Sequence, residues 1–390
     1  MGNTAVVVGG GIGGLAAAIG LRRIGWEVTV VERASTLEDA GAGISLAANG
    51  LRALDELSVG EAVRDASRGQ YSGGTRTPEG RWLARMDGAV LEKAVGTPIM
   101  GIPRSTLHRL LREALPTEAL LIGSEAGSVR QIGPGTVRVR CGDTVRDADL
   151  VVAADGIGSK VRSVLFPAHP GPVYSGSTVL RAITEQAVEL RTDFELTWGR
   201  GAEFGHIAFR DGRAEWHAVL NLPAGARFAD PLAELRRRFR NWHDPIPALI
   251  DATRPAAVLH HDVNEIRTPL PSYTVGRIAL LGDAAHAMTP NLGQGACQAL
   301  EDAVTLAASL ATEPTVDAAL ARYDAERRPR SQAVARAARQ AGRMGQQLSH
   351  PLAVTLRNTA MRLTPSRTAT RMILRHHAWV PPQLNRWSCR

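Results

Sequence analysis

Cysteine is scarce in this chain of 390 residues, which has three: Cys141, Cys297 and Cys389. An odd number of cysteines without the paired spacing of zinc ligands argues against a disulfide framework and against a metal site. Apolar runs of about 20 residues are also missing, so no membrane insertion is expected. The N-terminus lacks the basic region that precedes the apolar stretch of a secretory signal. We therefore expect a cytoplasmic protein without a bound metal.

Lysine is nearly absent, because Lys93 and Lys160 are the only two and almost all positive charge is arginine. The net charge is +8, and the stretch from Pro314 to Arg390 alone holds 14 arginines and three acids. A nucleic-acid surface would normally add lysines, aromatic residues and glycine-rich loops to such charge. We expect no nucleic-acid partner and a solvated basic face, with attraction of an anionic substrate or a dinucleotide phosphate as the alternative.

The chain length and the changes of sequence pattern along the chain predict two domains that are interleaved. Segments 1–70, 98–165 and 275–330 alternate apolar strands with helices, as expected of a Rossmann-like α/β domain in discontinuous pieces. Segments 71–97 and 166–274 show short alternating strands, prolines and Asp-Gly turns, which indicate an inserted mixed sheet for the substrate. The remainder, 331–390, is predicted to be helical. The fold class is α/β, or α+β overall.

Glycines open the first helix-like segment in the pattern G-x-G-x-x-G, at Gly9, Gly11 and Gly14. The pattern alone is weak in a glycine-rich chain, but here it follows an apolar strand and begins a helix. The next strand ends at Glu32, 23 residues after Gly9, near the spacing at which an acid binds a ribose hydroxyl pair. Arg33 could then cover the adenine or its ribose. This context predicts a dinucleotide whose pyrophosphate lies at the helix N-terminus.

Two later strand ends carry further candidates. "DLVVAADG" places Asp155 after a buried strand, although an Asp-Gly pair there is often just a turn. "GDAAHAMTPNLGQGACQALEDA", Gly282 to Ala303, places Asp283 at the C-terminal end of another strand, where ligands bind in such sheets. Its helix starts between Gly293 and Gly295, and the free N–H groups there suit a negative charge such as that of a reduced flavin.

Together these segments resemble the class A flavoprotein monooxygenases, the para-hydroxybenzoate and salicylate hydroxylase family. The resemblance covers most of the chain, to about Arg330. It implies FAD as cofactor, NADPH or NADH as electron donor without a domain of its own, and O₂ as oxidant. It also implies hydroxylation of a small aromatic molecule, phenolic, heteroaromatic or polycyclic, through a C4a-hydroperoxyflavin.

The family pattern implies a role for each matching position. Gly13 and Gly14 would meet the pyrophosphate of FAD, and Glu32 and Arg33 its adenosine ribose. Arg104 matches the family arginine near the ribityl chain, and Val129 matches the position whose backbone contacts adenine. Asp283 matches the acid that binds the ribityl chain. Leu292, Gly293 and Gly295 match the backbone at the pyrimidine edge of the flavin. Pro290 matches the proline beside the reaction zone, and His286 matches the motif, with a structural hydrogen bond as the expected role.

The stretch "EFGHIAFRDGRAEWHAVLN" predicts a hairpin around Asp211-Gly212. A loop of even length pairs His206 with His217 and Ile207 with Trp216, on opposite faces. The face with Ile207, Phe209 and Trp216 would then be an apolar substrate pocket. Either histidine could be a catalytic base, although charged neighbours favour a surface or structural role. A loop of odd length would shift this register.

Two other functions stay open at this point. One is a flavin epoxidase or urate-type hydroxylase that acts on a non-benzenoid substrate. The other is a flavin-binding protein without monooxygenase activity, which the intact Asp155, Asp283, Pro290 and glycine-rich helix start disfavour. The sequence does not decide between a monomer and a homodimer.

Overall fold

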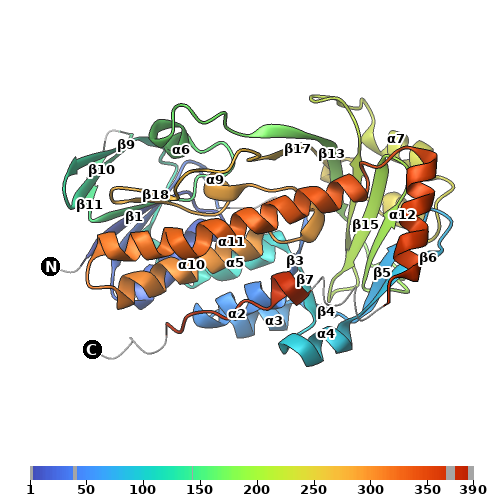
Figure 1. Ribbon diagram of the computed structural model, residues 1–390, viewed down its shortest axis with the longest axis horizontal. Helices are drawn as coiled ribbons and strands as arrows, with labels where there is room; N and C mark the ends of the chain where they lie inside the picture. The colour runs from blue at the N-terminus through green and yellow to red at the C-terminus, as the bar shows by residue number, and fades with distance from the viewer. Residues whose placement is uncertain (1–2, 38–41, 143, 366–373, 385–390) are drawn as a thin grey trace.

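A six-stranded sheet forms the centre of one lobe, on the left of Figure 1. The computed structural model describes residues 3–37, 42–142, 144–365 and 374–384. The strands of this sheet, in spatial order, are β18 (Thr274–Val275), β19 (Ile278–Leu280), β12 (Leu150–Ala153), β1 (Thr4–Val8), β2 (Glu27–Glu32) and β8 (Leu120–Ile122). All neighbours run parallel except β18 and β19. Central strands of such a sheet are buried on both faces, which explains the continuous apolar run of β1.

Helix α1 (Ile12–Arg23) packs against this sheet, and α10 (Gly295–Thr312) packs against α1. Their contact surfaces consist of small side chains. A Cβ atom placed on Gly20 would lie 3.1 Å from the Cβ of Ala307, and one placed on Gly13 would lie 3.2 Å from the Cβ of Ala299. The close approach brings the start of α10 to the edge of the sheet where α1 begins. A three-stranded sheet of β11 (Thr144–Ala148), β10 (Thr136–Cys141) and β9 (Ala126–Gly133) also packs against the strands.

A seven-stranded sheet forms the second lobe, on the right of Figure 1. Its strands are β17 (Leu259–Glu265), β13 (Val173–Ile183), β16 (Ala214–Leu220), β15 (Ala202–Ala208), β14 (Phe194–Trp198), β5 (Ser72–Arg76) and β6 (Trp82–Asp87). Helices α7 (Pro231–Phe239) and α8 (Ile246–Asp251) cover one face and build a second hydrophobic core with it. We call this face the outer face and the opposite one, toward the first lobe, the inner face.

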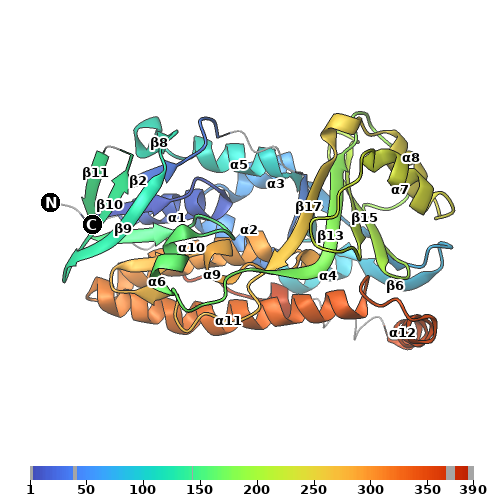
Figure 2. The same cartoon turned by 90° about the horizontal axis from the view of Figure 1, so that it is seen from above.

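A small sheet of β3 (Gly43–Leu46), β7 (Ile99–Pro103) and β4 (Arg68–Gln70) lies between the two lobes and contacts β15 and β16. Helix α11 (Val316–Met344) has 29 residues, about 43 Å at 1.5 Å per residue, and runs along both lobes (Figures 1 and 2). Further helices are α2 (Ala48–Glu56), α3 (Gly60–Ala66), α4 (Gly88–Val95), α5 (Arg104–Glu113), α6 (Lys160–Leu165), α9 (Asp283–His286) and α12 (Pro351–Leu363), and residues 374–377 are also helical. Within the stretch expected to be helical, 331–390, positions 366–373 and 385–390 lie outside the described residues.

Candidate active site

The C-terminal ends of four neighbouring parallel strands lie level along one edge of the six-stranded sheet. In the order β2, β1, β12 and β19, the paired end residues are Val31, Val8, Ala153 and Leu280. Four candidate residues lie within three positions after these ends: Glu32, Gly9, Asp155 and Asp283. Three strand spacings give this row a length of about 14 Å. Segments far apart in the chain therefore meet along one edge, which suits an extended ligand.

The glycine-rich turn after β1 is tightly packed where side chains are missing. Gly9 has φ +107°, and a Cβ atom there would lie 2.4 Å from the carbonyl oxygen of Ala154. A Cβ atom on Gly14 would lie 1.9 Å from the oxygen of Gly9, so neither position accepts a side chain. Gly11 is different, because no atom lies within 4 Å of a Cβ placed there. The backbone at the start of α1 is thus left open to a ligand, as the glycine pattern predicts.

Two side chains hold this turn in place. The carboxylate of Glu32 accepts hydrogen bonds from the backbone N–H of Gly10 at 2.7 Å and of Ala34 at 2.8 Å. Nε2 of His108 donates to the carbonyl oxygen of Gly10 at 2.7 Å, and His108 is buried. His108 on α5 was not identified from the sequence, because its partner lies 98 positions away. Arg104 begins α5, where its backbone N–H donates to Ala42, and Arg33 is exposed next to Glu32.

The acids after β12 and β19 differ in their surroundings. Oδ2 of Asp155 accepts a 3.3 Å hydrogen bond from Val161, whereas its Oδ1 is buried and has no partner among the described residues. Buried polar atoms rarely stay unsatisfied, so this oxygen could accept a hydrogen bond from a ligand at this edge. Asp283 is exposed at the first position of α9, after Gly282 with φ +61°. The open glycine backbone and the two acids fit a dinucleotide cofactor.

A buried ionic network lies beneath the Gly282 turn. Asp302 on α10 accepts hydrogen bonds from the backbone N–H of Gly282 at 3.0 Å, from His286 at 2.6 Å and from Arg327 at 2.7 Å. Burial alone would raise the pKa of Asp302, but His286 and Arg327 outweigh it and lower that pKa to about 2. Asp302 and Glu301 in turn raise the pKa of Arg327 against the effect of burial. The turn that carries Asp283 is therefore attached to a buried, ion-paired core.

A second branch of this network holds the start of α10. Glu301 accepts hydrogen bonds from Asn49 at 2.7 Å and from Arg330, and Asn49 also donates to Gln294 at 2.8 Å. Gln294 directly precedes Gly295, so its side chain positions the helix start that the sequence links to the flavin. Pro290 and Leu292 lie in the single turn just before it, at Pro290–Leu292.

The loop of the β15–β16 hairpin corrects the register expected from the sequence. The backbone N–H of Phe209 donates to the oxygen of Arg213 at 2.9 Å, and Gly212 has φ +82°. The loop therefore has three residues with a left-handed glycine at the end, rather than two. An odd loop shifts every pair by one position.

As a result, the expected pairs His206–His217 and Ile207–Trp216 are wrong. His206 pairs with Trp216, and Ile207 pairs with Glu215. Trp216 lies on the outer face, stacked on Phe204 with ring centroids 5.6 Å apart, and not beside Ile207. His206 shares that outer face, where burial lowers its pKa to about 4. It is a neutral, buried histidine rather than a solvent-facing one.

His217 lies on the inner face, between two buried carboxylates. Its Nδ1 is 3.3 Å from Glu215 and its Nε2 is 3.8 Å from Glu203. Burial lowers the pKa of His217, but the two carboxylates outweigh it and hold that pKa above the ordinary value. Glu203 accepts a 2.6 Å hydrogen bond from Trp198, and burial raises its pKa. A Cβ atom on Gly205 would lie 2.4 Å from Nε2 of His217, so the ring extends over this glycine.

Strand β3 connects this inner face with the cofactor edge. A Cβ atom on Gly43 would lie 2.6 Å from the Cβ of Glu215 and 2.8 Å from the ring of Phe209. Ser45, two residues along on the same side of β3, lies 3.9 Å from a Cβ atom placed on Gly293. Glu215 and the helix start at Gly293 therefore flank the same short strand.

Inner-face side chains also remain accessible. Along β14, Phe194, Leu196 and Trp198 on the inner face are partly exposed, whereas Glu195 and Thr197 on the outer face are buried. The inner face is therefore a wall that solvent or a small molecule can reach.

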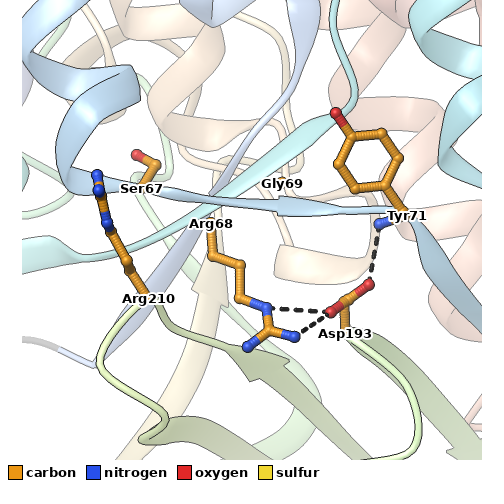
Figure 3. A pocket seen from close by; sticks show the side chains of 6 residues that line it. All are labelled: Ser67, Arg68, Gly69, Tyr71, Asp193 and Arg210. Carbon is orange, nitrogen blue, oxygen red and sulfur yellow. Dashed lines mark hydrogen bonds and ion pairs between the residues drawn. The ribbon is translucent and has the colours of Figure 1, made fainter.

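A surface hollow of about 520 Å³ lies at the junction of β4 with the loop before β14, lined by Ser67, Arg68, Gly69, Tyr71, Asp193 and Arg210 (Figure 3). Its two arginines already have partners. Arg68 forms an ion pair with Asp193 at 2.7 Å, and Arg210 donates to the carbonyl oxygen of Asp65. We therefore interpret this hollow as a structural junction between the lobes.

Comparison with known proteins agrees with a dinucleotide-binding site at the strand ends. Residues 3–338 match the family described as FAD binding domain. The chain is 38% identical to aurachin C monooxygenase/isomerase of Stigmatella aurantiaca, over 94% of this chain and 95% of that protein. It is 34% identical to the 2-heptyl-3-hydroxy-4(1H)-quinolone synthase of Pseudomonas aeruginosa, over 95% and 96%. The crystal structure of Klebsiella pneumoniae HpxO with FAD and uric acid superposes with a TM-score of 0.90 at 25% identity, over 97% of each chain.

The chain is a class A FAD-dependent monooxygenase. This monooxygenase is an oxidoreductase that uses FAD, takes electrons from NADPH or NADH and consumes O₂. The function and the cofactors implied by the resemblance are thereby confirmed, as is the fold class. Within the described ranges, none of its helices has the length and hydrophobicity that a bilayer crossing requires. The contacts of single residues with FAD remain predictions, including that of Val129, whose side chain is buried in β9.

Proposed function

We propose that this monooxygenase hydroxylates a small nitrogen-containing aromatic ring, held with an N–H or O–H edge against His217, Glu203 and Glu215. The observation that carries the proposal is the polarity of the inner face, where one imidazole lies between two carboxylates. The printed names of two relatives agree with it, since one makes a 4(1H)-quinolone and another was crystallised with uric acid.

The charges of this wall disfavour a benzoate-type substrate. Two carboxylates beside a single histidine would repel a carboxylate brought against them, and burial strengthens that repulsion. A ring N–H or phenolic O–H could instead donate to Glu203, whose raised pKa makes it a better proton acceptor. Arg181, opposite His217 on β13, offsets part of this negative charge.

His217 is suited to hold the substrate oxygen. Its Nε2 is 3.8 Å from Glu203, too far for a hydrogen bond, so this N–H can donate to a ring carbonyl or hydroxyl oxygen. Its raised pKa favours the charged imidazole, which would stabilise negative charge on that oxygen. An anionic ring oxygen makes the ring more electron-rich, and electrophilic hydroxylation requires such a ring.

The cofactor would lie along the strand ends opposite this wall. We propose that the open backbone from Gly11 to Gly14 holds the pyrophosphate, that Glu32 holds the adenosine ribose, and that Asp283 binds the ribityl chain. When bound, FAD supplies the activation of O₂. The residues named above would position FAD and the substrate, and Pro290 and Gly293 would lie beside the reacting ring.

Substrate-stimulated oxidation of NADPH tests the proposal. A panel of 2-alkyl-4(1H)-quinolones, hydroxypyridines, uric acid, salicylate and 4-hydroxybenzoate would be assayed, with product mass as the second readout. We expect a nitrogen heterocycle to give a product heavier by one oxygen. Preferential turnover of a benzoate would contradict the substrate role proposed for the inner face. It would not contradict the FAD-binding role proposed for the strand ends. Turnover of uric acid alone would place the enzyme with the urate-type hydroxylases.

A further inference from the structure

Helix α12 carries an apolar stripe that faces solvent. Leu352, Leu356 and Leu363 are 75%, 72% and 77% exposed. Their spacing, four and eleven residues from the first, places them within about 40° of one another around the helix axis. Single exposed leucines are common on protein surfaces, but three in line on one short helix form an apolar stripe.

The opposite side of α12 fixes this orientation. Val354 and Arg357 are buried, and Arg357 donates to the last carbonyl oxygens of α11, to Met344 at 3.2 Å and Gly345 at 2.9 Å. Its guanidinium also lies over the ring of Trp198, 5.2 Å from the centroid. Because α12 is held by this side, the leucine stripe points outward. Figures 1 and 2 show α12 at the corner of the molecule next to β6, away from the six-stranded sheet.

The C-terminal sequence that carries the stripe has positive charge only. Glu326 is the last acid of the sequence, and 13 arginines follow it. Some are neutralised by acids from other segments, as Arg339 is by Glu265 at 2.7 Å. Others near α12 are exposed, including Arg343 at the end of α11 and Arg362 on α12 itself. The surface thus combines exposed leucines with excess arginine.

We propose that α12 docks in the plane of an anionic lipid bilayer, with Leu352, Leu356 and Leu363 inserted among the headgroups and the arginines on phosphate groups. Interfacial helices combine an apolar face with basic flanks in this way. At 13 residues α12 is about 20 Å long, enough to lie on a bilayer but not to cross it. A second copy of the chain fits less well, because pairing two such stripes would bring like charges together.

Vesicle co-sedimentation of the FAD-loaded enzyme tests the proposal. The probes are vesicles of phosphatidylcholine alone and of equal parts phosphatidylcholine and phosphatidylglycerol, at low and high salt. The variant is Leu352→Ser/Leu356→Ser. The control is Val164→Ser, which removes an apolar side chain of similar exposure, 65%, from α6. Both changes are at the surface, so folding should be preserved.

We expect the wild type and Val164→Ser to sediment with the anionic vesicles and to be released by high salt. The leucine variant should lose at least tenfold in partition while keeping its flavin and its activity. Failure of the wild type to bind anionic vesicles would overturn the proposal. Equal binding of the leucine variant would do the same, as would a leucine-dependent dimer in solution without vesicle binding. The docking proposal does not rest on the substrate proposed above.

Discussion

Replacing Asp302 by asparagine tests whether the buried ionic network holds the cofactor edge. The change keeps the shape of the side chain but removes its charge. It also replaces one carboxylate oxygen, which accepts hydrogen bonds from Gly282, His286 or Arg327, by an amide NH₂ group that can only donate. Lowering the pKa of Asp302 from 3.8 to about 2 corresponds to about 2.5 kcal/mol of native-state stabilisation. Breaking a buried ion pair costs about 3–5 kcal/mol, and Arg327 keeps Glu301 as a partner. We therefore expect a loss of about 3 kcal/mol.

Urea unfolding of the apoprotein at pH 7 measures this loss, and titration with FAD measures its effect on the Gly282 turn. The matched control is Glu326→Gln, which removes an exposed helical ion pair with Arg322 and should cost less than about 1 kcal/mol. Because the pKa of Asp302 is lowered by folding, its contribution is complete above pH 3.8 and is lost as pH falls toward 2. A loss below about 1 kcal/mol for Asp302→Asn, or unchanged FAD affinity, would refute the reasoning.

Three further predictions concern the two sides of the site. Asp283→Ala should weaken FAD binding by about tenfold to a hundredfold, as loss of a hydrogen bond to a charged group does, and unchanged flavin occupancy would exclude the ribityl role. In the wild type, kcat/KM should fall as pH rises through the raised pKa of His217, because the charged imidazole donates to the substrate. In His217→Gln this pH-dependent fall should be absent, and kcat/KM should be lower by about tenfold or more. Gly205→Ala should push the His217 ring aside and raise KM with an unchanged flavin spectrum, so an unchanged KM would contradict the placement of that ring over the glycine.

The strand ends of the cofactor edge could be predicted from the sequence because each carries its signal in a few consecutive residues. An apolar strand followed by glycine or Asp-Gly marks such a junction without knowledge of the rest of the fold. The structure has Gly9, Asp155 and Asp283 at these junctions, side by side along one edge. What local pattern cannot supply is the partner from a distant segment, so His108 and the contact of Asp302 with Arg327 were missed.

The inner face shows a second limit of prediction from sequence, which is the register of paired strands. The hairpin was expected at the right place, but one residue in its loop decides which side chains face the cofactor. A left-handed Gly212 and a three-residue loop give an odd register, and every side chain changes face. Trp216 thereby joined the outer core, and Glu215 and His217 the inner face. The carboxylates beside His217 could be found only once the register was known.

Oxygen-isotope labelling tests the central claim most directly. The FAD-loaded enzyme would be given NADPH and a substrate identified from the panel above, under ¹⁸O₂ in ordinary water. The account predicts a product that carries one labelled oxygen atom per molecule, with NADPH consumption that depends on the substrate. A product labelled only from water, or a purified protein that retains no flavin, would contradict it.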